Sequence, residues 1–358
     1  MRDIRDIKIL EDIPILVRTA LNMPVVGGKV ANDYRLRRAL PTIQYLRERG
    51  ARVILISHIG ESGVDTLEPV AKALGKLIPN VSFCSETLGP RTRSAIRELS
   101  PGDVLVLENL RRNKGEKAND MAFARELATL ADVFVQDCFD SCHRQHASIV
   151  SLPSLLPSYA GILIQEEITE LSRALKPKSP SLAVVGGAKF STKEAVLIKL
   201  LGTYDHVFVG GALASDFLKA SGKNVGKSLV SGADPTYLKK ILANPKVVLP
   251  VDSIVVNEMI LDHGTKTTAM LAELVNVAKT ILWNGPLGKY EDGFLDATRD
   301  FAQAVAKSKA YSVVGGGDTI TAIEGLGLLS KFSFVSTGGG AMLQFLAEGN
   351  LPGIRALD

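Results

Sequence analysis

Short apolar runs recur along the chain, and each is followed by a polar loop or an amphipathic stretch. Four runs lie in the first half, at residues 15–17, 53–56, 104–107 and 133–135, and six lie in the second half, at 182–185, 206–209, 247–251, 280–283, 311–314 and 332–335. The stretches between them include amphipathic segments at 35–49, 192–201 and 297–308. Strands that are apolar throughout are buried on both faces, so the alternation predicts an α/β fold with parallel sheets covered by helices.

The composition excludes several classes of protein. The 358 residues suffice for roughly two domains. A hydrophobic content of 46% is too high for a disordered chain, and no apolar run is long enough to span a membrane. The net charge of +4, without a dense basic and aromatic run, favours small anionic ligands over nucleic acid. Three cysteines cannot form a disulfide framework and the N-terminus has no signal core, so we expect a cytoplasmic protein.

One segment near the middle of the chain interrupts this rhythm. Residues 152–176 are typical of a proline-containing turn followed by a long helix from about residue 160 to 175. Pro177 and Pro180 end this helix. The helix carries acidic residues early and basic residues late, as the helix dipole favours. Because it divides the strand–helix units into two sets, we predict that it joins two domains; an ordinary crossover helix is the alternative.

Glycine-rich loops follow four of the predicted strands in the second half, at 186–189, 210–212, 315–318 and 338–340. In an open α/β sheet, ligands bind beyond the carboxyl ends of the strands, where glycine lets backbone amides approach a phosphate. The four loops together therefore predict a nucleotide site. None matches G-x-G-x-x-G, which argues against a dinucleotide-dependent enzyme. Residues 221–228 resemble a P-loop, but three residues instead of four separate the glycines and a helical pattern precedes them, so we expect no phosphate site there.

Charged residues at these loops indicate how a nucleotide would be held. Lys189 and Lys193 are four residues apart where a loop enters a helix, so both can face one phosphate chain. Asp318 is the last residue of the glycine-rich loop at 315–318, where a carboxylate can hold Mg²⁺ against nucleotide oxygens. A solvated helix face is the alternative for the two lysines.

A second set of polar residues lies in the first half, mostly just after predicted strands: Asn22, Arg35, His58, Arg111, Arg144 and His146. The guanidinium fork pairs with both phosphate and carboxylate groups, so arginines that converge from several loops suit a small phosphorylated acid. Scattered surface arginines are the alternative.

Collinear motifs run through both halves of the chain: LVRTALNMP at 16–24, SHIG at 57–60, LENLR at 107–111, DCFDSCHRQHAS at 137–148, GGAK at 186–189, GKSL at 226–229, LPVD at 249–252, WNGP at 283–286, GGGD at 315–318 and STGGG at 336–340. With these motifs in this order, the chain resembles the phosphoglycerate kinase family along nearly all of its length.

The resemblance implies two Rossmann-like lobes with parallel sheets, joined by a long interdomain helix. It places an acid-binding lobe at 1–155, the interdomain helix and hinge at 156–178, a nucleotide-binding lobe at 179–340, and a tail at 341–358 that packs back toward the first lobe. It also implies reversible phosphoryl transfer between 1,3-bisphosphoglycerate and ADP, giving 3-phosphoglycerate and ATP, with Mg²⁺ and hinge closure. We expect a monomer that acts on these small molecules, without nucleic acid or membrane as partner.

The resemblance also implies roles for particular residues. The acid-binding positions are Asn22, Arg35, His58, Arg111 and Arg144. The nucleotide-binding positions are Gly187, Lys189, Lys193, Asn284, Glu291, Gly316, Gly317, Asp318 and Thr319, with Asp318 as the metal-binding residue. Arg35 and Lys189 are the catalytic pair that flanks the transferred phosphoryl group. This chemistry requires placement and charge compensation and no covalent intermediate.

The chain departs from the family pattern mainly on the acid side. Ala20 replaces an aspartate that contacts the substrate hydroxyl, Glu61 replaces an arginine that faces the substrate phosphate, and Asp140 replaces a glycine. A desolvated Glu61 opposite a phosphate would be repulsive. An ATP-binding homologue with an altered acid substrate or without turnover is therefore the alternative function. The chain is also shorter than is usual for the family. We expect much of this difference in length to fall between residues 252 and 264.

Overall fold

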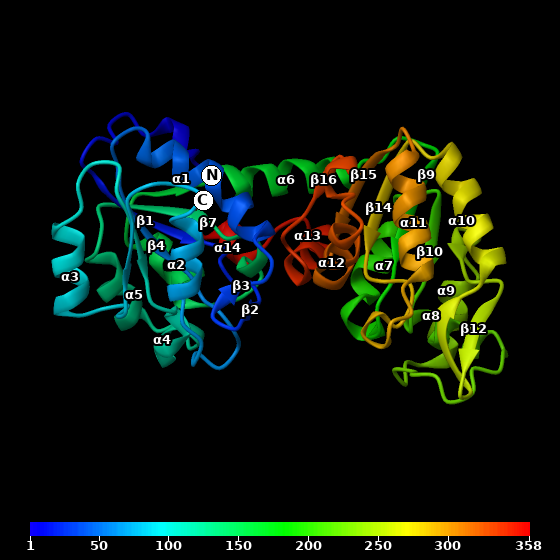
Figure 1. Cartoon of the computed structure of the whole chain (residues 1–358). Helices are drawn as coiled ribbons and strands as arrows, with labels where there is room; N and C mark the ends of the chain where they lie inside the picture. Colours follow the sequence, from blue (N-terminus) through cyan, green and yellow to red (C-terminus); the bar gives the residue numbers. More distant parts are fainter. The chain divides into compact units, whose positions relative to one another are not determined.

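The computed structural model describes residues 1–358, which divide into two units with one large sheet each (Figure 1). Unit 1 contains residues 1–168 and 350–358, and unit 2 contains residues 169–349. The boundary falls within helix α6 (Ile162–Ala174), which corresponds to the long helix expected at 160–175. No helix in either unit combines the length and apolar character that crossing a bilayer requires.

Unit 1 is built on a six-stranded parallel sheet in the order β5-β6-β4-β1-β7-β8. Its strands are β1 (Pro14–Thr19), β4 (Arg52–Ile56), β5 (Val81–Cys84), β6 (Val104–Leu107), β7 (Val133–Asp137) and β8 (Ser158–Ala160), with a small hairpin of β2 (Val25–Val26) and β3 (Lys29–Val30). Its helices besides α6 are α1 (Tyr34–Arg47), α2 (Glu68–Leu74), α3 (Pro90–Arg97), α4 (Lys114–Lys117), α5 (Met121–Ala128) and α14 (Pro352–Arg355).

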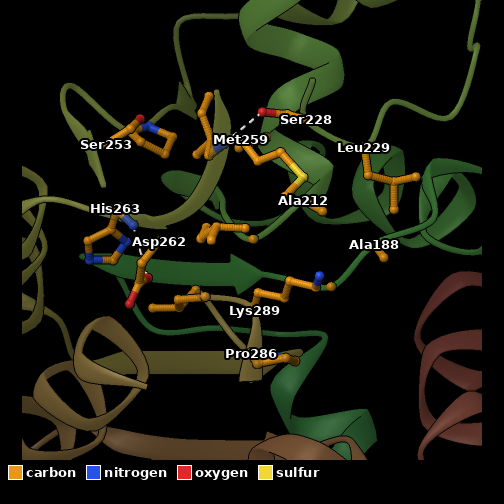
Figure 2. Close-up of a pocket in the computed structure, with 18 of the residues that line it drawn as sticks. Ala188, Ala212, Ser228, Leu229, Ser253, Met259, Asp262, His263, Pro286 and Lys289 are labelled. Carbon is orange, nitrogen blue, oxygen red and sulfur yellow. Dashed lines mark hydrogen bonds between the residues drawn. The ribbon is translucent and has the colours of Figure 1, made fainter. Parts of the chain in front are cut away.

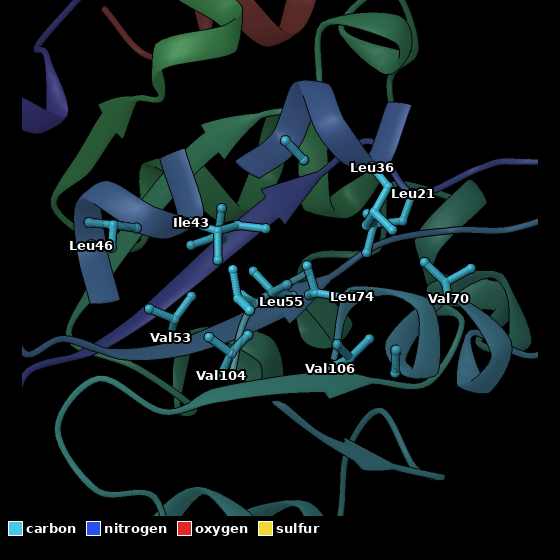
Figure 3. Close-up of a cluster of buried hydrophobic side chains, with 14 of the residues drawn as sticks. Leu21, Leu36, Ile43, Leu46, Val53, Leu55, Val70, Leu74, Val104 and Val106 are labelled. Atoms are coloured by element: carbon cyan, nitrogen blue, oxygen red, sulfur yellow. The ribbon is translucent and has the colours of Figure 1, made fainter. Parts of the chain in front are cut away.

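The apolar strands of unit 1 are buried on both faces because successive side chains point to opposite sides of the sheet. Val53 and Leu55 of β4 pack with α1 and α2, and Figure 3 shows their side chains in the same cluster as Ile43 of α1. Ile54 and Ile56 of the same strand belong to the other core, which α3 and α5 complete. This two-sided burial accounts for the continuous apolar runs in the sequence.

Unit 2 repeats this arrangement with a parallel sheet in the order β11-β10-β9-β14-β15-β16. Its strands are β9 (Ser181–Val185), β10 (His206–Val209), β11 (Val247–Val248), β14 (Thr280–Asn284), β15 (Tyr311–Gly315) and β16 (Phe334–Val335), with a separate hairpin of β12 (Ser253–Val256) and β13 (Met259–His263). Its helices are α7 (Glu194–Leu201), α8 (Leu213–Ala220), α9 (Pro235–Leu242), α10 (Thr265–Val277), α11 (Asp296–Lys307), α12 (Gly317–Gly325) and α13 (Gly340–Glu348).

The sheets confirm the predicted α/β class, and every predicted apolar run contains a strand. Strands β5 and β8 were not predicted. β8 lies in the stretch that was interpreted as a turn, and it is held by pairing with β7. The shortened stretch at 252–264 forms the β12–β13 hairpin, with Asn257 and Glu258 at positive φ in its turn. Residues 221–228, which resemble a P-loop, follow helix α8 and not a strand, as we predicted from the sequence.

The last part of the chain is divided between the two units, in contrast to the single tail predicted at 341–358. Helix α13 packs on α7 in unit 2, with Met342 and Phe345 buried. Residues 350–358 belong to unit 1, where the Gly353 amide donates a hydrogen bond of 2.8 Å to the Cys142 carbonyl. A Cβ on Gly353 would lie 2.7 Å from Ile149 Cγ2, so only glycine fits this contact. The chain end thus packs against the segment that carries Arg144.

Candidate active site

The polar residues predicted in unit 1 follow the carboxyl ends of adjacent parallel strands. Asn22 follows β1, His58 follows β4, Arg111 follows β6, and Arg144 follows β7. Strands β4, β1 and β7 are neighbours, and the strand order changes direction between β1 and β7. Ligands of open parallel sheets bind at such a reversal. We call these residues, with Arg18 and Arg35, the basic cluster.

Arg35 lies in the first turn of α1 and is held from two sides. Its Nη1 donates a hydrogen bond of 2.6 Å to the Asn22 carbonyl and lies 3.2 Å from Oδ2 of Asp140. The Asp140 side chain is buried, and its Oδ1 accepts hydrogen bonds from Cys138 Sγ at 2.9 Å and from Ser141 Oγ at 3.2 Å. Burial alone would raise the pKa of Asp140, but the Arg35 charge, other nearby positive charges and the hydrogen bond from Cys138 together outweigh it and hold that pKa at about 2. Asp140 is therefore an ionised partner of Arg35.

His58 is buried and fixed by Arg18, the last but one residue of β1. Arg18 Nη2 donates a hydrogen bond of 2.9 Å to His58 Nδ1, so the remaining ring nitrogen Nε2 carries the hydrogen of the neutral ring. Burial lowers the pKa of His58 well below its usual value, and the Arg18 charge lowers it further. His58 therefore offers a neutral N–H donor and no positive charge.

Arg111 and Arg144 share one carboxylate. Arg111 Nη1 lies 3.0 Å from Glu61 Oε2, and Arg144 Nη2 lies 3.9 Å from Glu61 Oε1. The Arg111 side chain is fully buried, whereas that of Glu61 is 76% exposed. The expected repulsion of a desolvated Glu61 therefore does not apply, because the side chain is in water and beside two positive charges. Ala20 is fully buried, and His146 Nδ1 lies 3.9 Å from Glu116 Oε1.

In unit 2 the strand-end loops of β9 and β14 meet where the strand order reverses. The Gly186 amide donates to the Asn284 carbonyl at 2.8 Å, and the Gly187 amide donates to the Pro286 carbonyl at 3.2 Å. A Cβ on Gly186 would lie 2.2 Å from the Pro286 oxygen, so the close approach of the two loops requires glycine. The structure thus gives a steric reason for one of the glycine-rich loops.

Lys193, Asn284 and Thr319 connect three loops in unit 2. Lys193 Nζ donates a hydrogen bond to Asn284 Oδ1, and the Gly285 amide donates to Thr319 Oγ1 at 3.1 Å. All three side chains are buried. Burial lowers the pKa of Lys193 to about 8, although the negative charge of Asp318 opposes this effect. Asp318 is therefore near enough to Lys193 to influence its charge.

A pocket of about 400 Å³ opens beside these loops (Figure 2). Of the predicted nucleotide residues, Gly187, Glu291 and Asp318 line it. Lys193, at the start of α7, and Asn284, at the end of β14, are hydrogen-bonded to each other beside it. Lys189 is exposed in the loop after β9, and Gly316 and Gly317 form the turn that enters α12. The walls are largely apolar, with Leu218, Leu229, Met259, Ile260, Pro286 and Leu287 among the lining residues. A largely apolar pocket with a few polar groups suits a heterocyclic base followed by charged phosphates.

The sequence did not identify several residues that line this pocket. Met259, Asp262 and His263 belong to β13, whose hairpin forms one wall. Burial raises the pKa of Asp262 to about 6 and lowers that of His263 to about 4. The motif at 249–252 lies just before this hairpin. Its residue types do not indicate that strand β13 turns back to line the pocket.

Comparisons with known proteins point to one family. The family model described as "Phosphoglycerate kinase" matches residues 4–349. A phosphoglycerate kinase of Pelotomaculum thermopropionicum is 39% identical over 388 aligned residues, which cover 99% of this chain and 98% of that protein. The crystal structure of phosphoglycerate kinase from Pyrococcus horikoshii has a TM-score of 0.91 at 32% identity and covers 100% of this chain and 98% of its own. The structure of the enzyme from Coxiella burnetii has a TM-score of 0.83 at 38% identity, with coverages of 99% and 98%.

These findings confirm the family expected from the motifs and the kinase activity that it implies. They give no support to the alternative of lost turnover. The residues Ala20, Glu61 and Asp140 are therefore departures within a phosphoglycerate kinase scaffold. The chain belongs to the phosphoglycerate kinase family.

Proposed function

We propose that the chain catalyses reversible phosphoryl transfer between 1,3-bisphosphoglycerate and ADP, with 3-phosphoglycerate bound by unit 1 and the nucleotide bound by unit 2. The observation that carries this assignment is the separation of two kinds of site. The basic cluster offers arginines and a neutral histidine, and the other site combines an apolar pocket with lysine and carboxylate groups.

The acid-binding residues that we propose are Asn22, Arg35, His58, Arg111 and Arg144. The guanidinium groups pair with carboxylate and phosphate oxygens, and the His58 Nε2 hydrogen can be donated to a further oxygen. The contacts of Arg35 with Asn22 and Asp140 fix its guanidinium before substrate binds. Such preorganisation lowers the cost of aligning charge at the reacting group.

The nucleotide-binding residues that we propose are Gly187, Lys189, Lys193, Asn284, Glu291, Gly316, Gly317, Asp318 and Thr319. The glycine loops and the N-terminus of α12 offer backbone amides to phosphates. The exposed Asp318 carboxylate lines the pocket, and its charge partly opposes the lowering of the Lys193 pKa by burial. This position fits a residue that holds Mg²⁺ beside phosphate oxygens. When bound, Mg²⁺ would neutralise charge on the nucleotide phosphates.

Phosphoryl transfer depends here on the placement of the two substrates and on compensation of the negative charge of the transferred group. Arg35 and Lys189 are proposed to flank the transferred group from the acid side and the nucleotide side. Because the two sets of residues belong to different units, direct transfer requires the bound acid and the bound nucleotide to be brought together during turnover, and such closure would also exclude water. We further propose a cytoplasmic monomer, consistent with the three buried cysteines, which form no disulfides.

A pair of binding measurements on variants tests the division of roles. Arg35→Ala is expected to weaken 3-phosphoglycerate binding and to leave the dissociation constant of ATP unchanged. Asp318→Asn is expected to weaken ATP binding in the presence of Mg²⁺ and to leave 3-phosphoglycerate binding unchanged. Calorimetric titration of each ligand into each variant gives both results, and an Arg35 variant that loses ATP affinity would contradict the assignment.

A further inference from the structure

The Arg111 guanidinium is short of partners for a buried charge. Its side chain is fully buried, and Nη1 is engaged by the Gly60 carbonyl and by Glu61. Nε and Nη2 are buried without a hydrogen-bond partner. Burial lowers the pKa of Arg111, as expected for a charge that is poorly solvated. A buried donor without an acceptor is costly, so this guanidinium is prepared for an anion with more oxygens than one carboxylate supplies.

Glu61 is the present anionic partner, and its backbone is firmly held. The Gly60 amide donates to Asn22 Oδ1 at 3.1 Å, and Lys117 Nζ donates to the Glu61 carbonyl. Gly63 packs so closely that a Cβ there would lie 2.4 Å from the Arg111 carbonyl oxygen. The loop backbone is therefore fixed against Arg111, and the Glu61 side chain is the part that is free to move.

The Glu61 carboxylate is held far less firmly than that of Asp140, the other acid that pairs with an arginine of the basic cluster. Asp140 is buried and accepts two side-chain hydrogen bonds in addition to its ion pair with Arg35. Glu61 is 76% exposed, and its second contact, to Arg144, is 3.9 Å long. Because the Glu61 carboxylate is in water, its ion pair contributes less to stability than a fully buried one would. Glu61 can therefore leave the arginines at small cost, whereas Asp140 cannot.

We propose that the Glu61 carboxylate is a built-in competitor for the anionic group of the acid substrate: it bridges Arg111 and Arg144 in the free protein, and the substrate's phosphate or carboxylate displaces it. That the acid is 3-phosphoglycerate rests on the proposed function. Displacement of the Glu61 carboxylate is expected for any oxyanion that binds these two arginines strongly enough. Glu61 then determines specificity, because only an anion that interacts with the arginines more strongly than a carboxylate will bind. Monoanionic acids are excluded at concentrations at which phosphorylated acids bind.

The test compares Glu61→Gln with wild type, using inorganic phosphate and 3-phosphoglycerate as titrants in calorimetry. The variant keeps the length of the side chain and removes its charge. We expect the dissociation constant of inorganic phosphate to fall by about fivefold, near the upper end of what an exposed ion pair is worth. In kinetics, KM for 3-phosphoglycerate is expected to fall by a similar factor, whereas KM for ATP stays constant.

Glu68→Gln is the matched control, because Glu68 is a partly exposed acid of the same unit that pairs only with Lys72 on α2. It removes the same charge away from the basic cluster and should change neither constant. Weaker phosphate binding in Glu61→Gln would show that Glu61 holds the arginines in place, and this would overturn the proposal. Equal binding in both variants and wild type would overturn it too. If phosphate binding tightens but 3-phosphoglycerate is neither bound nor phosphorylated by wild type, the displacement stands and the proposed function fails.

Discussion

Lys193 Nζ donates a hydrogen bond to Asn284 Oδ1, which joins the loop after β9 to the end of β14 beneath the proposed phosphate site. Both side chains are buried, and the amide oxygen does not neutralise the ammonium group. A buried lysine with a neutral partner gains from the arrival of an anion. The pair is thus arranged to receive a phosphate charge.

The lowered pKa of Lys193 predicts how nucleotide binding depends on pH. With a pKa of about 8, Lys193 is mostly protonated at neutral pH and loses its proton above it. Since a phosphate binds the protonated form, ATP affinity should be constant from pH 6.5 to 7.5 and fall by up to about tenfold per pH unit well above pH 8. Lys193→Arg keeps the charge and should abolish the fall. The same pH profile in that variant would contradict the prediction.

Lys189→Ala is predicted to reduce kcat by about 10²- to 10³-fold, the usual cost of removing one group that stabilises charge in the transition state. The side chain is exposed in the loop after β9, so the melting temperature should not change. Lys199→Ala, another exposed lysine on α7, is the control and should retain full kcat. Steady-state kinetics and thermal melts of both variants provide the measurement, and near-normal turnover of Lys189→Ala would remove it from the catalytic pair.

The Arg35–Asp140 ion pair predicts a dependence of stability on acidity. The pKa of Asp140 is about 2 in the folded protein and near 3.8 in the unfolded chain, so its ionised form stabilises the fold by about 2 kcal/mol above pH 4. That contribution is lost as the pH falls from about 4 to 2. Urea unfolding of wild type and Asp140→Asn should therefore differ at pH 6, differ less at pH 3 and converge toward pH 2. A difference that is independent of pH would show that the carboxylate charge is not responsible.

Gly186→Ala is predicted to weaken ATP binding by at least tenfold and to lower the melting temperature, because the added Cβ would collide with the Pro286 carbonyl oxygen. The loops after β9 and β14 would have to separate. Gly325→Ala provides the comparison, since no atom lies within 4 Å of a Cβ at that position in α12. That variant should bind ATP normally and keep or slightly raise the stability. Calorimetry and thermal melts report both effects, and equal behaviour of the two variants would argue against the steric explanation.

The sequence predicted the repeated α/β architecture because buried parallel strands are apolar on both faces, as Val53, Ile54 and Leu55 illustrate. It did not reveal β5 and β8, whose residues include Ser82 and Ser158 and whose pairing with β6 and β7 supplies their stability. A short strand with mixed side chains carries little local signal, so only its neighbours in the sheet define it.

The candidate site was predictable at the level of residue type and loop position. The arginines of the first half and the glycine loops of the second follow strands, and parallel sheets bring such positions together. The behaviour of Glu61 and Asp140 was not predictable, because one acid is exposed and the other buried, and exposure is a property of the folded loop. The contribution of β13 to the pocket likewise depends on a hairpin whose turn residues, Asn257 and Glu258, gave no distinct signal.

The proposed activity is measured by a coupled assay of the purified chain with ATP, Mg²⁺ and 3-phosphoglycerate. We expect ADP formation that saturates in both substrates, depends on Mg²⁺ and is reduced at least a hundredfold in Lys189→Ala. ATP binding to the wild-type chain without phosphorylation of 3-phosphoglycerate would contradict it.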